Sequence, residues 1–210
     1  AVARDTATAL QSSTFGKVRE PLLRLSAYLR AVGNSSDSGQ YLIDSTDDVG
    51  QLAQSALRAP SVFNFYRPGY VYPGGASAAR GLAAPELQIA NESSAAGYAN
   101  FMRDMIASGV GRTSTANPSG VLRRDVRLSY SLDTSNDWYT LAKATDATAL
   151  IERVNRKLMY GTLPDALRAE MKATLDSFTL SATPTEAQVR NRLQAALLMA
   201  VVSPEFLIQK

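Results

Sequence analysis

The sequence predicts a mostly helical protein with little or no β structure. Apolar side chains recur at intervals of three and four residues near the N-terminus, around residue 100 and in three segments of residues 145–210. A long segment rich in proline, glycine and aromatic residues separates the first of these regions from the second. We therefore expect a C-terminal three-helix bundle packed with N-terminal helices through this long loop.

The N-terminal helical region spans residues 15–56. Pro21 suits a first helical turn, where its missing N–H group leaves no helical hydrogen bond unmade. Gly33 suits the C-terminal end of this helix, and acidic residues before Val49 favour a second, short helix up to about Ala56. The apolar face of the first helix repeats at three and four residues, at Leu22, Leu25, Leu29 and Val32.

Residues 57–90 form the long loop. Pro60, Pro68, Pro73 and Pro85 interrupt any helix in this region. A connection of this length without its own periodicity is uncommon in a compact domain and is usually functional or disordered. The aromatic residues argue against disorder, because disordered linkers are poor in them. We therefore expect a rigid loop.

A further helix is predicted over residues 91–109. Asn91 is a suitable N-cap, Glu92 lies in the favourable first turn, and Gly109 ends the periodic pattern. Apolar residues then alternate over residues 126–132, which is typical of an extended segment. The sequence offers no second strand for this segment, so we expect it to lie across the helices.

Residues 145–210 have the clearest helical pattern, with three periodic segments joined by short connections. The first of the three has Thr145 or Asp146 as its cap. The last has Thr183 as its cap and Glu186 three residues later, which is the pattern of a capping box. Apolar residues occupy several faces of this last helix, so we place it at the centre of the bundle.

Composition excludes several classes of site within this chain. With no histidine and no cysteine, the chain cannot form zinc sites of those residues, Ser-His-Asp or Cys-His catalytic groups, or a histidine general base. The net charge of +3 comes from 22 basic and 19 acidic residues without a block of five like charges, which argues against nucleic-acid binding. The longest strongly apolar run, residues 195–202, is too short to span a membrane, and residues 1–10 lack a signal-peptide pattern.

The long loop carries the candidate contact surface. In one interpretation the loop is a cover whose Phe63, Phe65 and Tyr66 plug a groove between helices. In the other, exposed tyrosines form a platform for a sugar ring or a partner peptide, and an arginine supplies a charged hydrogen bond. The candidate residues are Phe63, Phe65, Tyr66, Arg67, Tyr70, Tyr72 and Glu86.

The acidic residues suggest two further hypotheses. Glu86 and Glu92 could supply oxygen ligands to Ca²⁺, although their spacing matches no known calcium loop. Asp47 or Asp48 could join Glu86 as a carboxylate pair of the glycosidase type. In the simpler interpretation the acids are solvated or lie near helix ends, and Glu86 contacts a loop N–H group or Arg67. We expect no metal and no cofactor.

Five stretches of the chain, taken in order, resemble one family: FGKVREPLLRL, RAPSVFNFYRPGY, LAAPELQIANESSAAGYANFM, LIERVNRKLMYGTLPDALRAEM and VRNRLQAALLMAVVSPEFLIQK. Together they resemble the C-terminal half of the bacterial domain-of-unknown-function 1800 family. The resemblance implies a mostly helical fold and an exported protein, and it implies no activity that can be carried over. It also implies an N-terminal half with a histidine- and arginine-bearing motif. The chain is then a single helical domain or the C-terminal part of a larger protein.

These observations favour a non-enzymatic structural or interaction subunit of an exported assembly, in the periplasm or at the cell surface. The expected partner is a protein or the N-terminal half of the same precursor. Rigid aromatic segments lose little conformational entropy on binding, which favours recognition. Two alternatives stay open, a carbohydrate-acting hydrolase and a glycan-binding module, with a site in the loop or in the missing half.

Overall fold

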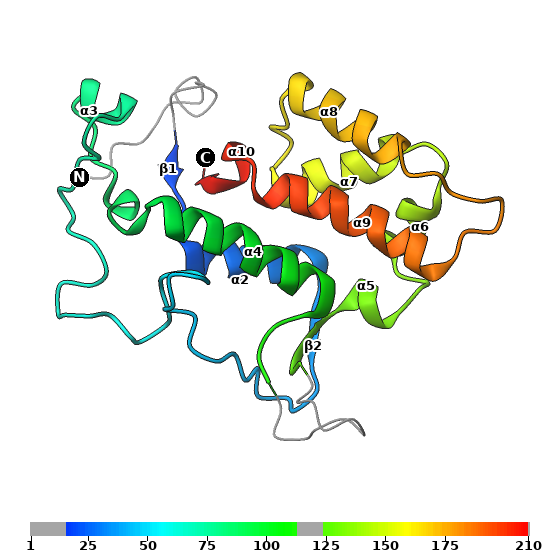
Figure 1. Cartoon of the computed structure of the whole chain (residues 1–210), viewed down its shortest axis with the longest axis horizontal. Coiled ribbons are helices and arrows are strands. Elements are labelled where there is room, and N and C mark those ends of the chain that lie inside the picture. The colour runs from blue at the N-terminus through cyan, green and yellow to red at the C-terminus, as the bar shows by residue number, and fades with distance from the viewer. Residues whose placement is uncertain (1–15, 113–123, 210) are drawn as a thin grey trace.

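The computed structural model describes residues 16–112 and 124–209 (Figure 1). About 50% of the chain is helical and 6% is in strands, which confirms the predicted fold class. No helix in these two ranges is long and apolar enough to cross a membrane. The expectation for residues 1–10 lies outside the described residues. The helical segments are α2 (Pro21–Val32), α3 (Ala76–Ala79), η1 (Pro85–Ile89), α4 (Glu92–Ser108), α5 (Ser129–Leu132), α6 (Asp137–Lys143), α7 (Thr148–Leu158), α8 (Asp165–Asp176), α9 (Glu186–Val201) and α10 (Pro204–Leu207).

Helix α9 lies at the centre of the molecule, as the sequence predicts. It contacts α6, α7, α8 and α10 of the C-terminal part and α4 of the N-terminal part (Figure 1). Small side chains at Ala196 and Ala200 let neighbouring helices approach closely, and Leu193 and Leu197 fill the spaces between them. All four side chains are fully buried, because partners cover this helix on several sides.

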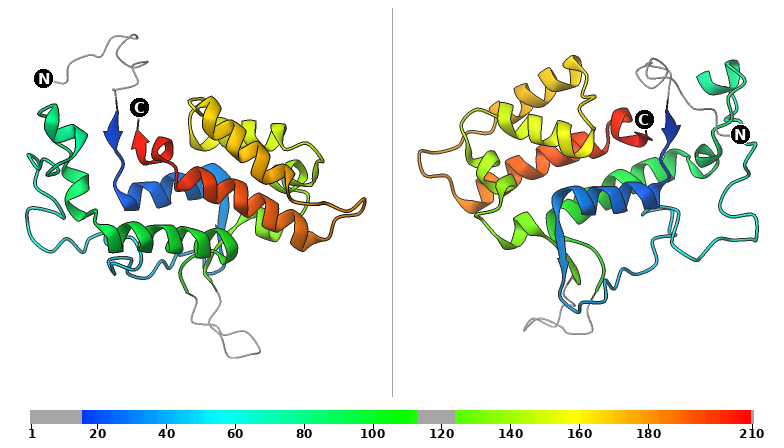
Figure 2. Two further views of the ribbon diagram at one scale, coloured as in Figure 1. Left: turned by 45° about the horizontal axis from the view of Figure 1, so that its top comes forward. Right: turned by 180° about the vertical axis from the view of Figure 1, so that it is seen from behind.

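The N-terminal helices pack directly on the C-terminal bundle. Helix α4 lies against α9 and helix α2 lies against α7, so both parts share one continuous hydrophobic core (Figure 2). The long loop reaches this junction at its C-terminal end, where Leu87 and Ile89 line the same cavity as Leu207. The joining that we expected from the loop is therefore done largely by helix-to-helix burial.

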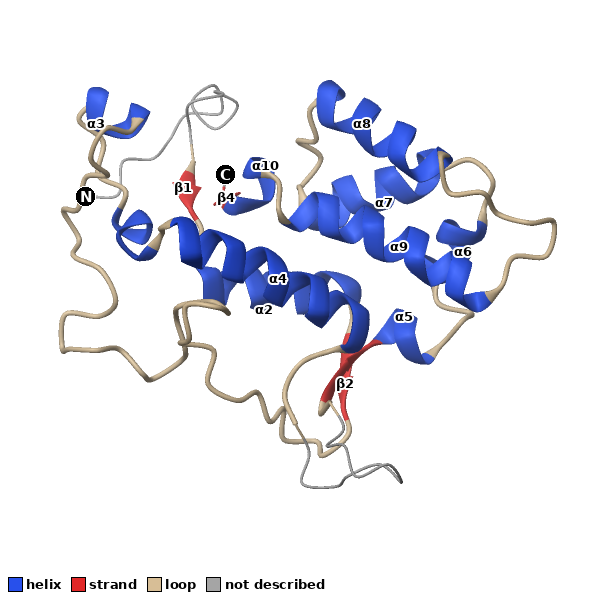
Figure 3. Ribbon diagram, viewed as in Figure 1, coloured by secondary structure: helices blue, strands red, loops and turns tan. Residues whose placement is uncertain are grey.

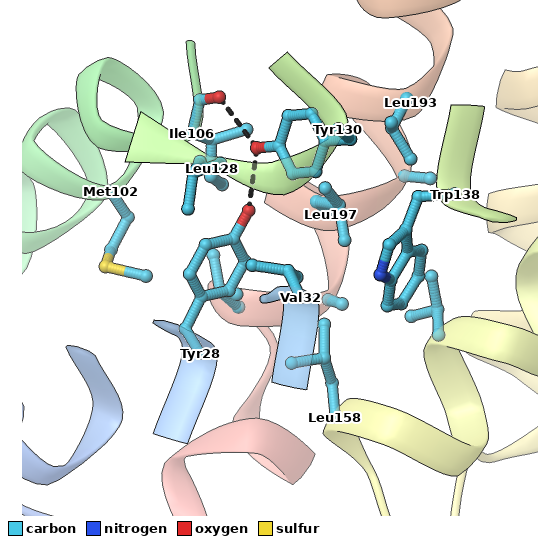
Figure 4. Close-up of a cluster of buried hydrophobic side chains, with 14 of the residues drawn as sticks. Tyr28, Val32, Met102, Ile106, Leu128, Tyr130, Trp138, Leu158, Leu193 and Leu197 are labelled. Carbon is cyan, nitrogen blue, oxygen red and sulfur yellow. Dashed lines mark hydrogen bonds between the residues drawn. The ribbon is translucent and has the colours of Figure 1, made fainter. Parts of the chain in front are cut away.

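Two buried tyrosines supply polar contacts within the core (Figure 4). The Tyr130 hydroxyl on α5 donates to the carbonyl of Ile106 on α4 across 2.7 Å. The Tyr28 hydroxyl on α2 lies 3.0 Å from the Tyr130 hydroxyl and is the donor, because Tyr130 has only one hydroxyl hydrogen. Burial raises the pKa of both tyrosines well above the usual value. This chain of hydrogen bonds ties three helices together.

Two short antiparallel strand pairs complete the fold (Figure 3). Strand β1 (Lys17–Val18) pairs with β4 (Ile208–Gln209), and β2 (Asn34–Ser36) pairs with β3 (Val126–Leu128). The expectation that residues 126–132 lack a partner is therefore wrong. The partner strand consists of three polar residues without any alternation, so its sequence gave no sign of a strand.

Residues 49–56 form a series of turns and not the predicted helix. The carbonyl of Asp48 accepts the N–H groups of Gln51 and Ala53, and its side chain accepts the N–H of Gly50 at 2.6 Å. These local bonds take up the N–H groups that would otherwise begin a helix, which is how aspartate competes with helical structure.

Two of the helix caps can be compared directly with the sequence predictions. Asn91 caps α4, as predicted, and forms a capping box with Ser94. The cap of α9 is Thr185 and not Thr183. Helix α9 therefore begins two residues later than predicted. The Gln188 side chain accepts the N–H of Thr185 at 2.8 Å and completes a capping box at that position.

Asp146 connects the start of α7 to α8. The formal N-cap is the next residue, Ala147, but the Asp146 carboxylate accepts the N–H of Thr148 at 3.2 Å. Lys172 of α8 donates to the same carboxylate at 2.7 Å. This bond from Lys172, followed by those from Thr148, lowers the pKa of Asp146 to about 2.

Arg192 of α9 is a buried cation, with 1% of its surface exposed. Its guanidinium donates to the carbonyl oxygens of Leu175 at 2.9 Å, Ala142 at 3.1 Å and Thr145 at 3.1 Å, and also to that of Ala144. These oxygens lie at the C-terminal ends of α8 and α6, where a helix leaves carbonyl groups without partners. One side chain therefore closes two helix ends against a third helix.

The positive charge of Arg192 is compensated as well as hydrogen-bonded. Helix C-termini carry partial negative charge, and two of them face this guanidinium. The carboxylate of Asp176 lies 3.6 Å from it.

Asp125 ties the segment that follows β2 to the start of β3. Its carboxylate accepts the N–H groups of Ser38 at 2.8 Å and Leu42 at 2.7 Å, and the hydroxyl of Ser36 at 2.9 Å. Asp125 is fully buried. Burial alone would raise its pKa, but the hydrogen bonds outweigh burial and hold the pKa below the usual value.

Replacing the buried cation tests its role in joining the helices. Arg192→Met should lower the free energy of unfolding by about 3–5 kcal/mol, because buried helix-end carbonyl groups lose their donors. Urea unfolding followed by circular dichroism measures this loss. Arg156→Met, which changes an exposed arginine of α7, is the matched control and should alter the value by less than about 0.5 kcal/mol. Equal effects from both variants would contradict the role given to Arg192.

Asp125→Asn should lower the melting temperature at neutral pH, and the difference from the parent protein should shrink in acid. The folded-state pKa of Asp125 lies below the unfolded value of about 3.9, so the ionised carboxylate stabilises the fold above that value. This contribution is lost as the pH falls through the folded-state pKa. Melting curves of both proteins between about pH 2 and 7 check the prediction. A difference that stays constant over this range would refute it.

Candidate functional site

Exposed apolar side chains gather on the segment between β2 and α4. This segment contains the short helices α3 and η1 and little other regular structure. Of the fourteen exposed large hydrophobic residues in the described ranges, ten lie between residues 41 and 82. Large exposed apolar areas on a soluble domain mark interaction sites. The ten are Tyr41, Leu42, Ile43, Val49, Leu57, Val62, Phe63, Val71, Tyr72 and Leu82.

The seven candidate residues of the loop lie in different environments. Phe63 is 74% exposed and Tyr72 is 39% exposed. Arg67 is also exposed, whereas Glu86 is buried. An arrangement with phenylalanines inside is wrong for Phe63, because this residue sits in a turn closed by the N–H of Asn64 and the carbonyl of residue 61. The half-buried candidates are Phe65, Tyr66 and Tyr70.

Tyr66 attaches the loop to the start of α2. Its hydroxyl donates to the carboxylate of Glu20, and the Gln54 side chain donates to the same carboxylate at 2.7 Å. Gln54 in turn accepts the N–H of Leu22 at 3.1 Å, one of the groups that a first helical turn leaves free. Burial, followed by the hydrogen bond and the charge of Glu20, raises the pKa of Tyr66 well above the usual value. Tyr66 is thus an anchor and not part of an exposed platform.

Two hydrogen bonds join the middle of the loop to its C-terminal part. The N–H of Arg67 donates to the side chain of Gln88 at 2.8 Å. The N–H of Ala84 donates to the carbonyl of Tyr70, also at 2.8 Å. These bonds close residues 67–88, while Arg58, paired with Asp47, and Tyr66, bonded to Glu20, hold the stretch that carries Val62 and Phe63.

Glu86 is engaged in a contact that the sequence did not indicate. Its buried carboxylate pairs with Lys17 at 3.0 Å and not with Arg67, whose side chain is exposed. Asp47, the possible second carboxylate of a hydrolase, pairs with an arginine of the loop at 2.9 Å. In the described part of the chain, no three His, Cys, Asp or Glu residues gather in a group that could hold a metal ion. The calcium hypothesis for Glu86 and Glu92 therefore gains no support.

A cavity of about 280 Å³ lies beneath the C-terminal end of the loop. Residues of α2, η1, α4 and the C-terminal segment around α10 form its walls. The charged wall residues are Arg24 and Glu86. The apolar ones include Leu52, Leu87, Ile89, Ala95, Tyr98 and Val202.

Arg19 and Arg24 are buried cations beside this cavity that the sequence reasoning missed. Arg19 is 4% exposed and Arg24 is 9% exposed. Arg24 shares the buried face of α2 with Leu25 and Tyr28. A basic residue inside an apolar helical face was the signal that could have identified it. Arg19 precedes the helix, and no periodicity marks it.

Comparison with known proteins places the chain in a family. The family model described as "Protein of unknown function (DUF1800)" matches residues 2–208. No curated protein and no solved structure matches the chain. The matched range includes the helical core, the long loop and the cavity. The chain therefore belongs to the DUF1800 family.

Proposed function

We propose that this chain is a non-enzymatic interaction subunit that binds a protein partner through residues 57–82, here called the contact loop. The observation that carries the proposal is the display of large apolar side chains on a fixed backbone. Val62 is 95% exposed and Phe63 is 74% exposed, while Tyr66 anchors the loop on α2. A surface that is already ordered loses little entropy on binding, which favours association.

The charge of the contact loop indicates the chemistry of the partner. The loop contains Arg58, Arg67 and Arg80 and no acidic residue. Arg58 is paired with Asp47, whereas Arg67 and Arg80 are exposed. Arginine beside exposed aromatic and aliphatic side chains is typical of protein interfaces. We therefore infer a partner whose apolar patch is bordered by carboxylates.

The backbone of the contact loop is strained where it displays apolar residues. Leu57 has φ of 59° and a fully exposed side chain. A bulky residue in this left-handed region costs conformational energy, and such strain clusters at functional sites. The exposed Leu57 side chain gains no burial in return, so a partner that covers it supplies the missing stabilisation.

We further propose that this interaction takes place in an exported assembly, in the periplasm or at the cell surface, as the family resemblance implies. The partner, whose apolar patch is bordered by carboxylates, is a separate protein or an N-terminal half of the same precursor. Fractionation of producing cells with an antibody to this chain tests the location.

A protein partner fits the contact loop better than a sugar does. Tyr70 is half-buried, and its carbonyl closes the base of the loop. The Tyr72 ring lies so close to Gly75 that a Cβ added to that glycine would be 2.8 Å from it. The Tyr70 side chain is therefore partly covered, and the Tyr72 ring has one atom beside the loop backbone. Glu86, the acidic residue of the hydrolase alternative, is paired with Lys17.

Photo-crosslinking in producing cells tests the contact loop. Benzoylphenylalanine in place of Phe63 should link to one partner protein, which mass spectrometry identifies. The same amino acid in place of Leu132, which is 44% exposed outside the contact loop, is the matched control and should not link to it. The variant Val62→Ser with Phe63→Ser should then bind the purified partner at least about tenfold more weakly, because exposed apolar anchors are lost.

The melting temperature of that double variant should stay close to the parent value, since both side chains are exposed. Equal cross-linking from position 132, or unchanged affinity of the double variant for the purified partner, would remove the proposal.

The substitution Leu57→Gly tests whether the Leu57 side chain contributes to partner binding or to the stability of the fold. Glycine tolerates the positive φ without strain but adds freedom to the unfolded chain, so the free energy of unfolding should change by less than about 1 kcal/mol. Affinity for the purified partner should fall, because a displayed apolar side chain is removed. A loss of more than about 2 kcal/mol in stability would mean that Leu57 supports the fold.

A further inference from the structure

The buried arginines Arg192, Arg19 and Arg24 differ in whether a carboxylate lies near the guanidinium group. Arg192 has carbonyl acceptors at two helix ends and a carboxylate at 3.6 Å. Arg19 and Arg24 are also more than nine-tenths buried, yet neither forms an ion pair with any described residue. A buried cation without a partner anion is costly, so structural arginines are normally compensated as Arg192 is.

Arg24 lines the cavity of about 280 Å³ with a guanidinium that is only partly used. Its Nε donates to the carbonyl of Arg19 at 2.6 Å, and its guanidinium carbon lies 5.0 Å from the centre of the Tyr98 ring. Its terminal nitrogens have no acceptor among the described residues, and they are not sealed from solvent. Two parallel N–H groups of an arginine match the two oxygens of a carboxylate.

Arg19 adds a second positive charge beside the first. Its guanidinium carbon lies 5.1 Å from the centre of the Phe206 ring and 5.8 Å from that of Tyr160. Its Nη1 is buried and has no hydrogen-bond partner in the described ranges. Burial holds the pKa of Arg24 below its usual value against the opposing effect of Tyr98, and the charge of Arg19 lowers it further. An anion bound nearby would relieve both effects.

The carboxylates of this region are already engaged elsewhere. Glu86 pairs with Lys17 at 3.0 Å. Glu20 accepts hydrogen bonds from Tyr66 and Gln54. Neither Arg19 nor Arg24 therefore pairs with a described carboxylate, and apart from Arg24 and Glu86 the cavity walls are mainly apolar.

We propose that this cavity binds a small organic carboxylate with an apolar tail. The carboxylate lies on the terminal nitrogens of Arg24, within the field of Arg19. The tail lies along Leu87, Ile89 and Ala95, which are apolar wall residues of the cavity. The volume suits a tail of a few carbon atoms, since a cavity of about 150 Å³ holds benzene. This site is separate from the contact loop, so either proposal can fail without the other.

Hexanoate is the probe, and its uncharged isostere hexanamide is the matched ligand control. Titration of methyl-labelled protein followed by NMR should give a dissociation constant for hexanoate below about 1 mM and shifts at the Ala95 and Ala99 methyl groups. Hexanamide should bind at least about tenfold more weakly, because it lacks the charge that Arg24 recognises. Equal binding of the two ligands, or no shifts with millimolar hexanoate, would overturn the proposal.

Three variants locate the site. Arg24→Gln should weaken hexanoate binding at least about tenfold. Arg30→Gln, at an exposed position of the same helix, should leave it unchanged. Ala95→Phe fills the cavity, keeps both arginines and should also abolish binding, so it decides the matter if Arg24→Gln does not fold. Binding that survives Arg24→Gln or Ala95→Phe would overturn the proposal.

Stability without ligand separates a binding role from a structural one. Arg24→Met removes an uncompensated charge, so the melting temperature of the ligand-free protein should change by less than about 3 °C. A fall as large as that caused by Arg192→Met would show that Arg24 supports the fold and would overturn the proposal.

Discussion

The packing of this protein depends on one buried guanidinium. The ends of α6 and α8 carry carbonyl groups that need donors, and they can meet at α9 only if that helix supplies those donors. Arg192 supplies them to Leu175, Ala142 and Thr145 from a single side chain. Apolar contacts are non-directional, whereas these bonds fix the position of each helix end. Once α6 and α8 are fixed, the remaining side of α9 is available to α4.

Polar bonds also fix the packing away from Arg192, where Tyr28, Tyr130 and Asp125 form buried hydrogen bonds. Each of these groups is satisfied, and the N–H groups of Ser38 and Leu42, in the long segment that follows β2, supply two of the hydrogen bonds to Asp125. That segment is also held by Tyr66 and by the burial of Leu52 in the core, while many of its other apolar side chains are exposed. Arg19 and Arg24 differ from these groups, because both are buried cations that form no ion pair with any described residue.

Helical periodicity located the main helices of the fold, and the apolar faces of α9 correctly placed it at the centre. The wrong structural predictions have two causes, which are local hydrogen bonds and strand pairing between distant parts of the chain. The helix expected after Val49 is replaced by turns because Asp48 captures the neighbouring N–H groups. Strand β2 was missed because three polar residues carry no pattern, and their partner β3 is distant in the sequence. Among the candidate residues, Phe63 is exposed and Tyr66 is an anchor, which composition could not distinguish.

Residue types and their local spacing identified the main helices, excluded sites built on histidine or cysteine, and showed that residues 57–82 combine aromatic residues and arginines without acids. These properties follow from residue type and from local spacing. The packing of distant segments sets which arginines have a partner anion, which aromatic side chains face solvent, and that Glu86 pairs with Lys17. Burial and charge pairing depend on residues that are distant along the chain and become neighbours only when the helices pack. For that reason, neither the cavity beside Arg24 nor the display of Phe63 could be inferred from spacing alone.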